Sequence, residues 1–252
     1  MGAPVSSADL LTHVLRQGDR ALVLAQRLGQ WLTHAPELEE DMALGNISLD
    51  LIGQARHLYT YAGEVEGKGH DEDHFAYWRG PDDFLNPLVV EQPNGDFAVT
   101  MARQVFHDHA AVLYWESMTT STDGTLAALA TKARNETAFH LQHSTGWLVR
   151  LGDGTDESHE RAQRGVDLMW PFAAELTGAA DEADLRAQGL VGPSIEVAWH
   201  EAVAATLATA GLTAPTEAEQ IGGGLYGRHS EHLAPLLDEM QSLARAHPGA
   251  SW

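Results

Sequence analysis

The chain has 252 residues, enough for one large domain or two small ones with hydrophobic cores. Its 15 lysine and arginine residues stand against 36 aspartate and glutamate residues, and the resulting formal charge of -21 repels nucleic-acid phosphates and anionic lipid headgroups. Cysteine is absent, which excludes disulfides, iron–sulfur clusters, thiolate zinc sites and cysteine nucleophiles.

The first nine residues, Met1 to Asp9, have neither the basic region nor the apolar core of a signal peptide. No later apolar run approaches the roughly 20 residues of a membrane span. We therefore expect a cytoplasmic chain without nucleic-acid or membrane partners. The acidity most simply keeps such a chain in solution, and it also suits a basic protein partner.

Two helices are predicted next, over residues 19–35 and 36–62. Apolar residues at helical spacing mark the first helix, and Gly18 and Asp19 offer a start for it. Pro36 suits the first turn of the second helix, because its fixed φ matches a helix and the missing N–H is not needed there. The expected buried stripe of the second helix consists of Ile47, Leu51 and Leu58.

A polar stretch over residues 64–83 then predicts a long connection, with one helical turn near residues 75–79. A third helix is expected over residues 96–119 and a fourth over residues 125–150, separated by a short turn at residues 121–124. Two helical hairpins joined by a long crossover have the connectivity of ferritin-like bundles. The predicted fold is therefore an all-α, ferritin-like helical bundle.

The rest of the sequence continues in helices, with a break near Trp170 and Pro171 and a flexible joint at residues 222–224. The expected helices are residues 156–176, 193–210 and 229–246. We predict a single domain over residues 1–252, with a core bundle at about 19–150 and C-terminal helices at about 156–246.

A ferritin-like di-metal site requires a Glu from each of two helices and a Glu-x-x-His from each of the other two. No histidine lies three residues after any glutamate in this sequence. The aspartate versions, Asp71 with His74 and Asp156 with His159, fit solvated loop or cap residues. Surface or cap roles are likewise expected for His229 and His232.

The fourth predicted helix carries Glu136, His140 and His143 on one face, at positions i, i+4 and i+7. These side chains could form a distorted mononuclear metal site, which would make the chain a stand-alone metalloenzyme. We favour a hydrogen-bonded polar network without metal, because such a network satisfies buried groups and fixes helix register. The expected members of this buried network are Asp50, Gln54, Asp108, Glu136, His140 and His143.

Several long blocks, in the same order, resemble a family of non-catalytic subunits of phenylacetyl-CoA 1,2-epoxidase, from phenylacetate degradation. They span nearly the whole chain, and no single short motif is as specific. The blocks are His34–Ala43, Leu49–Arg56, Tyr61–Glu64, Val90–Phe97, Leu151–Thr155, Gly227–His232, Met240–Gln241 and Pro248–Trp252.

The resemblance implies a ferritin-like, structural subunit of a multicomponent bacterial monooxygenase, in which a homologous catalytic subunit holds the di-iron centre. It implies no catalytic residue and no cofactor on this chain, whose Asp50–Gly53 and Glu136–Phe139 match the catalytic subunit's Glu-x-x-His without a histidine. The complex would epoxidise the aromatic ring of phenylacetyl-CoA, using dioxygen and electrons from a separate reductase. A self-associating structural protein without a catalytic partner is the third reading.

Overall fold

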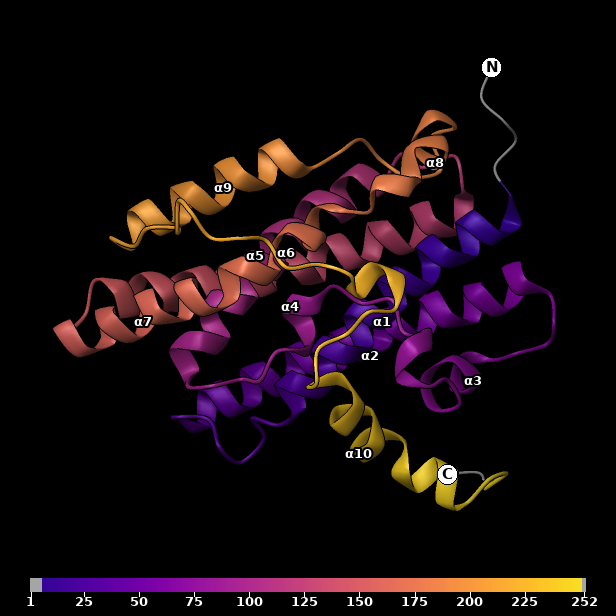
Figure 1. Cartoon of the computed structure of the whole chain (residues 1–252), viewed down its shortest axis with the longest axis horizontal. Coiled ribbons are helices and arrows are strands. Elements are labelled where there is room, and N and C mark those ends of the chain that lie inside the picture. Colours follow the sequence, from indigo (N-terminus) through magenta and orange to yellow (C-terminus); the bar gives the residue numbers. More distant parts are fainter. Residues whose placement is uncertain (1–5, 251–252) are drawn as a thin grey trace. The chain divides into compact units, whose positions relative to one another are not determined.

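The computed structural model describes residues 6–250, and within that range the chain forms helices and no strands (Figure 1). The first five residues of the Met1–Asp9 stretch and the last two of the Pro248–Trp252 block lie outside the described residues. No helix in the described part is long and apolar enough to cross a membrane. The all-α prediction is therefore confirmed.

Contacts group the described residues into two compact units. The terminal unit contains residues 6–93 and 223–250, and the central unit contains residues 94–222. The expectation of one domain over the whole chain stays a prediction. The helices of the terminal unit are α1 (Ser7–Gly29), α2 (Leu38–Glu66), α3 (Glu72–Tyr77), α4 (Leu88–Glu91) and α10 (Leu233–Ala246).

The first helix begins earlier than predicted, at Ser7 and not at Asp19. The Ser6 hydroxyl accepts a hydrogen bond from the Asp9 backbone N–H at 3.2 Å, and the Asp9 carboxylate accepts one from the Ser6 N–H at 3.3 Å. Together they form a capping box. Gly18 lies inside the helix because a Cβ there would lie 2.5 Å from a ring carbon of Tyr59. The glycine allows close packing and does not mark a helix start, so the core bundle begins before residue 19.

The second helix packs against the first and begins at Leu38, after Glu37 as its N-cap. Pro36 therefore precedes the helix and does not occupy its first turn, as the sequence had suggested. The helix runs to Glu66 and ends at Gly67, whose positive φ of 70° closes the last turn. The predicted buried stripe is confirmed for Ile47, Leu51 and Leu58.

The long connection between the two hairpins contains short helices. The predicted turn near residues 75–79 is α3, whose N-cap Asp71 accepts a hydrogen bond from the His74 N–H at 2.9 Å. This confirms the cap interpretation of Asp71. A 3-10 turn at Pro81–Asp83 and the helix α4 follow.

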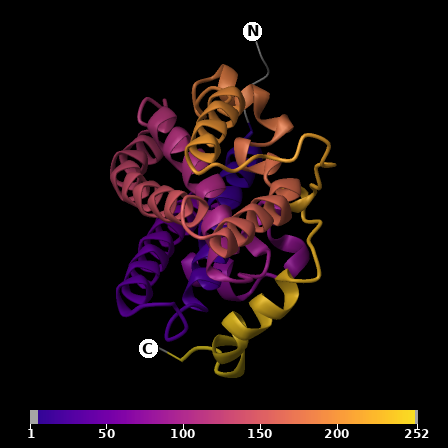
Figure 2. The ribbon, with the colours of Figure 1, turned by 90° about the vertical axis from the view of Figure 1, so that its left-hand side faces the viewer.

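The central unit is built on a second hairpin, whose two helices pack along each other as predicted. Asp96 and Asp123 cap their N-termini, each accepting backbone hydrogen bonds. Figure 2 shows α9 beside this hairpin, and α7 packs on the same two helices. The helices are α5 (Phe97–Met118), α6 (Gly124–Gly152), α7 (Asp156–Met169), α8 (Ala183–Ala187) and α9 (Glu196–Thr209).

The predicted break at Trp170 is confirmed, because α7 gives way there to a 3-10 turn at Trp170–Phe172. The Trp170 ring stacks on Trp199 of α9 with centroids 5.9 Å apart, and the Trp199 indole N–H donates to the Phe106 carbonyl at 2.8 Å. The last helix, in contrast, begins at Leu233 and not at His229. The side chain of His229 has another partner, described below.

Candidate functional site

The interior of the α5–α6 hairpin holds the carboxylate of Asp108, which is 1% exposed. The hydroxyl of Ser144, on α6, donates to one carboxylate oxygen at 2.8 Å. The Nδ1 atom of His107, itself buried, lies 2.9 Å from the other oxygen. A buried charge needs such partners, and this carboxylate finds them in the chain's own side chains.

On α6 the buried register differs by one residue from the predicted one. Thr137 and His140 are buried, and the Thr137 hydroxyl donates to a backbone carbonyl one turn earlier. Glu136 is only partly buried and pairs with Lys132 at 3.6 Å, while Phe139 is 75% exposed. The positions expected to match the Glu-x-x-His of the catalytic homologue therefore do not both face the interior. Thr137 and His140 are the buried pair with the same spacing.

The six residues of the predicted polar network differ in burial. Gln54, Asp108 and His140 are buried, whereas the remaining three side chains are only partly so. That these residues form one continuous network stays a prediction. The three partly buried members are Asp50, Glu136 and His143.

A second buried pair with a spacing of three residues lies on α5. Gln104 and His107 are 1% and 2% exposed, and the Gln104 amide has no hydrogen-bond partner among residues 6–250. Neither here nor at Thr137 and His140 does a carboxylate stand three residues before the histidine. Within the described residues, no group of three or more His, Cys, Asp or Glu is arranged to hold a metal ion. The residues present therefore do not fit a di-iron centre.

The terminal unit contains a buried ionic cluster around Asp19 of α1, which is fully buried. The Tyr59 hydroxyl donates to its carboxylate at 2.5 Å and the Leu85 N–H at 2.8 Å, while the Arg79 guanidinium forms a two-armed ion pair with it. Burial, and then the Asp19 charge, raises the pKa of Tyr59 well above its ordinary value. Burial alone would lower the pKa of Arg79, but Asp19 outweighs it and raises that pKa.

A second buried carboxylate, Glu91 of α4, binds the segment that precedes α10. One of its oxygens accepts from the Ser230 N–H at 2.6 Å, and the other lies 2.7 Å from Nδ1 of His229 and accepts from the Asn86 amide at 2.9 Å. The other ring nitrogen of His229 lies 2.7 Å from the Phe84 carbonyl. The surface or cap role expected for His229 is thus wrong, because its side chain is 5% exposed. Only a long-range contact, invisible in local patterns, links it to Glu91.

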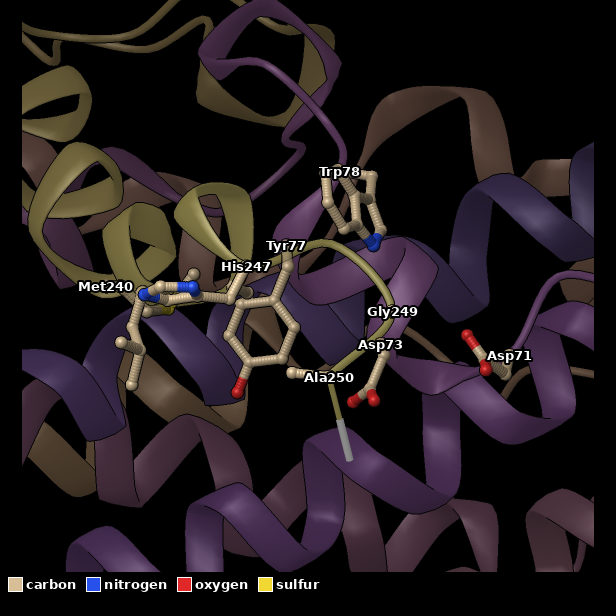
Figure 3. A pocket seen from close by; sticks show the side chains of 10 residues that line it. Asp71, Asp73, Tyr77, Trp78, Met240, His247, Gly249 and Ala250 are labelled. Atoms are coloured by element: carbon tan, nitrogen blue, oxygen red, sulfur yellow. The ribbon is translucent and has the colours of Figure 1, made fainter. Parts of the chain in front are cut away.

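A cavity of about 430 Å³ lies in the terminal unit, between α3 and the end of α10 (Figure 3). Asp71, Asp73, Tyr77 and Trp78 line one side, and His247 lies on the other. Burial, and then the neighbouring carboxylates, raises the pKa of Asp73. Carboxylates beside aromatic rings are suited to cationic groups.

The family comparison agrees with this geometry. Residues 2–252 match the family model described as phenylacetic acid catabolic protein. The chain is 48% identical over 248 residues to one subunit of the 1,2-phenylacetyl-CoA epoxidase of Escherichia coli (strain K12), which covers 97% of this chain and 99% of that protein. The resemblance predicted from the sequence blocks is confirmed. The chain therefore belongs to the phenylacetic acid catabolic protein family, whose members are ferritin-like helical proteins.

Proposed function

We propose that this chain is the structural, non-catalytic subunit of a cytoplasmic phenylacetyl-CoA epoxidase. In this proposal it stabilises a homologous subunit that holds the di-iron centre, and the assembled complex epoxidises the aromatic ring during aerobic phenylacetate catabolism. Dioxygen and the electrons of the reductase react at the partner's metal centre, and no step passes through residues of this chain. The relative named as a subunit of the epoxidase supports the assignment to such a complex.

The environment of Asp108 is the observation that carries the proposal. An inward carboxylate on a ferritin-like helix is normally available to a metal ion. Here both of its oxygens are engaged by Ser144 and His107. The side chains with Glu-x-x-His spacing on the same hairpin have an amide at Gln104 and a hydroxyl at Thr137 in place of the carboxylate. This arrangement supports a bundle that folds without metal.

Co-expression of the catalytic subunit with and without this chain tests the proposal. We expect the catalytic subunit to lose solubility and phenylacetyl-CoA turnover when it is produced alone, and to regain both when this chain is supplied. Normal solubility and turnover of the catalytic subunit alone would contradict the structural role. As a control, an unrelated acidic helical protein supplied at the same level should restore neither property.

A further inference from the structure

The helix α2 is apolar on two faces. Its buried face, which includes Leu44, Leu51 and Leu58, belongs to the core of the terminal unit, where α2 packs on α1. A different set of large apolar side chains on α2 is exposed to solvent. These side chains are Leu38, Met42, Leu49 and Ile52, with exposed fractions of 71%, 61%, 66% and 38%.

The exposed side chains follow a heptad pattern along the helix. Their positions advance in steps of four, seven and three residues, so that residue 45 is the missing member of a seam with alternating steps of four and three. Residue 45 is Gly45, and a Cβ there would lie 3.2 Å from Cδ2 of Leu32, which is itself 50% exposed. Leu32 therefore fills the gap. We call Leu32, Leu38, Met42, Leu49 and Ile52 the α2 stripe.

Exposed apolar surface of this extent has a physical consequence. A helix that is apolar on opposite faces is normally covered on both. A contiguous patch on the order of a few hundred Å² typically marks an interaction site. The heptad spacing further specifies the shape of the occupant, because such a seam receives the side chains of a second helix as knobs into holes.

Charge around the α2 stripe specifies the chemistry of that second helix. Glu37 and Glu39 are exposed at its N-terminal end and form no ion pair within residues 6–250, and Glu40 and Asp41 follow in the same turn. At the other end, Arg56 is already bound to Glu72 at 3.0 Å. A second copy of this chain would bring another charge of -21 to the same surface. A helix with lysine or arginine beside its apolar seam would complement it.

We infer that the α2 stripe binds a helix of the catalytic epoxidase subunit, one with an apolar seam flanked by basic residues. The inference rests on the proposed function and adds to it the surface of this chain through which the two subunits associate. The stripe forms the apolar centre of the interface, and the carboxylates at its N-terminal end form part of the polar rim.

The test uses the purified catalytic subunit as the probe and compares this chain with its variant Met42→Glu/Leu49→Glu. We expect the variant to bind at least about 30-fold more weakly, the effect of losing a central hot spot. The matched control is Phe139→Glu/Leu168→Glu, which changes two equally exposed apolar residues of the central unit and should alter the affinity less than about threefold. Circular dichroism should show both variants to be folded, since all four side chains are at least half exposed.

The outcomes separate this inference from the function on which it rests. Failure of the unchanged chain to bind the catalytic subunit overturns the proposed function, and the inference with it. Equal binding by the unchanged chain and the Met42→Glu/Leu49→Glu variant overturns the inference alone. Light scattering of the unchanged chain adds a further check, because a homodimer that only this variant dissociates, with catalytic-subunit binding intact, would assign the stripe to self-association.

Discussion

The imidazole of His229 lies 2.7 Å from the carboxylate of Glu91, a residue 138 positions earlier in the chain. The second ring nitrogen lies equally close to the Phe84 carbonyl, so both nitrogens face acceptors. An imidazole donates from both nitrogens only when it is protonated. Burial lowers the pKa of His229, but the hydrogen bonds to Glu91 and Phe84 outweigh it and raise that pKa.

This pair predicts a pH-dependent stability. Because the pKa of His229 is raised in the folded state, its contribution is fully present below the unfolded pKa of about 6.5 and is lost as pH rises through the folded value. We expect His229→Gln to lower the free energy of unfolding by about 1–3 kcal/mol at pH 6 and by less at pH 9. Urea unfolding at both values measures this, with the exposed His57→Gln as control. Equal losses at the two pH values would contradict the predicted protonation.

Removal of the Asp19 charge should destabilise the terminal unit. Asp19→Asn leaves the guanidinium of Arg79, which is 9% exposed, without its counter-ion. We expect a loss of about 3–5 kcal/mol in the free energy of unfolding, as for other broken buried ion pairs. Chemical denaturation monitored by circular dichroism gives the value. The exposed Asp238→Asn in α10 should change it by less than about 0.5 kcal/mol, and a similar loss in both variants would argue against the ion pair.

Two glycine substitutions should have opposite signs. At Gly18 an added Cβ would meet the Tyr59 ring at 2.5 Å, and that ring is fixed by its hydrogen bond to Asp19. Gly18→Ala should therefore destabilise by about 1–3 kcal/mol. Gly53 lies inside α2 with nothing within 4 Å of an added Cβ, so Gly53→Ala should stabilise by up to about 1 kcal/mol. Thermal melting of the two variants decides, and a shift in the same direction would show that packing against Tyr59 is unimportant.

Metal analysis of the purified chain tests the alternative of a stand-alone metalloenzyme. We expect far less than one iron or manganese per chain, because Glu136 pairs with Lys132 and the three candidate ligands are not arranged as a metal-binding group. The catalytic subunit, purified and measured in parallel, serves as the positive control. Stoichiometric metal that is lost in His140→Ala would instead establish a site at Glu136, His140 and His143.

Local signals predicted much of the helical framework. Asp96 and Asp123 act as N-caps where the sequence placed helix starts, and the break at Trp170 lies beside Pro171. The start of α1 was missed because Gly18 resembles a helix boundary, although it serves the contact with Tyr59. A glycine required by a neighbouring helix cannot be distinguished from a punctuating one in a single sequence.

The candidate site was predicted less well, for a geometrical reason. Helical spacing placed Glu136, His140 and His143 on one face, but a face about 100° wide admits two adjacent registers. Burial selects Thr137 with His140, one residue away from the expected Glu136 with Phe139. Asp19 and Arg79, like Glu91 and His229, meet only through tertiary contacts. No periodic pattern connects such residues.

The division of the chain into units has a consequence for its synthesis. The central unit is a continuous stretch, Asn94–Gly222, whereas the terminal unit combines the beginning of the chain with its end. Glu91 leaves the ribosome early, but its partners Ser230 and His229 follow only near termination. Since domains generally fold as units during translation, the central unit can fold first, while α1 and α2 wait for the last segment. Proteolysis of stalled nascent chains should find the N-terminal hairpin as the vulnerable part until residue 230 has emerged.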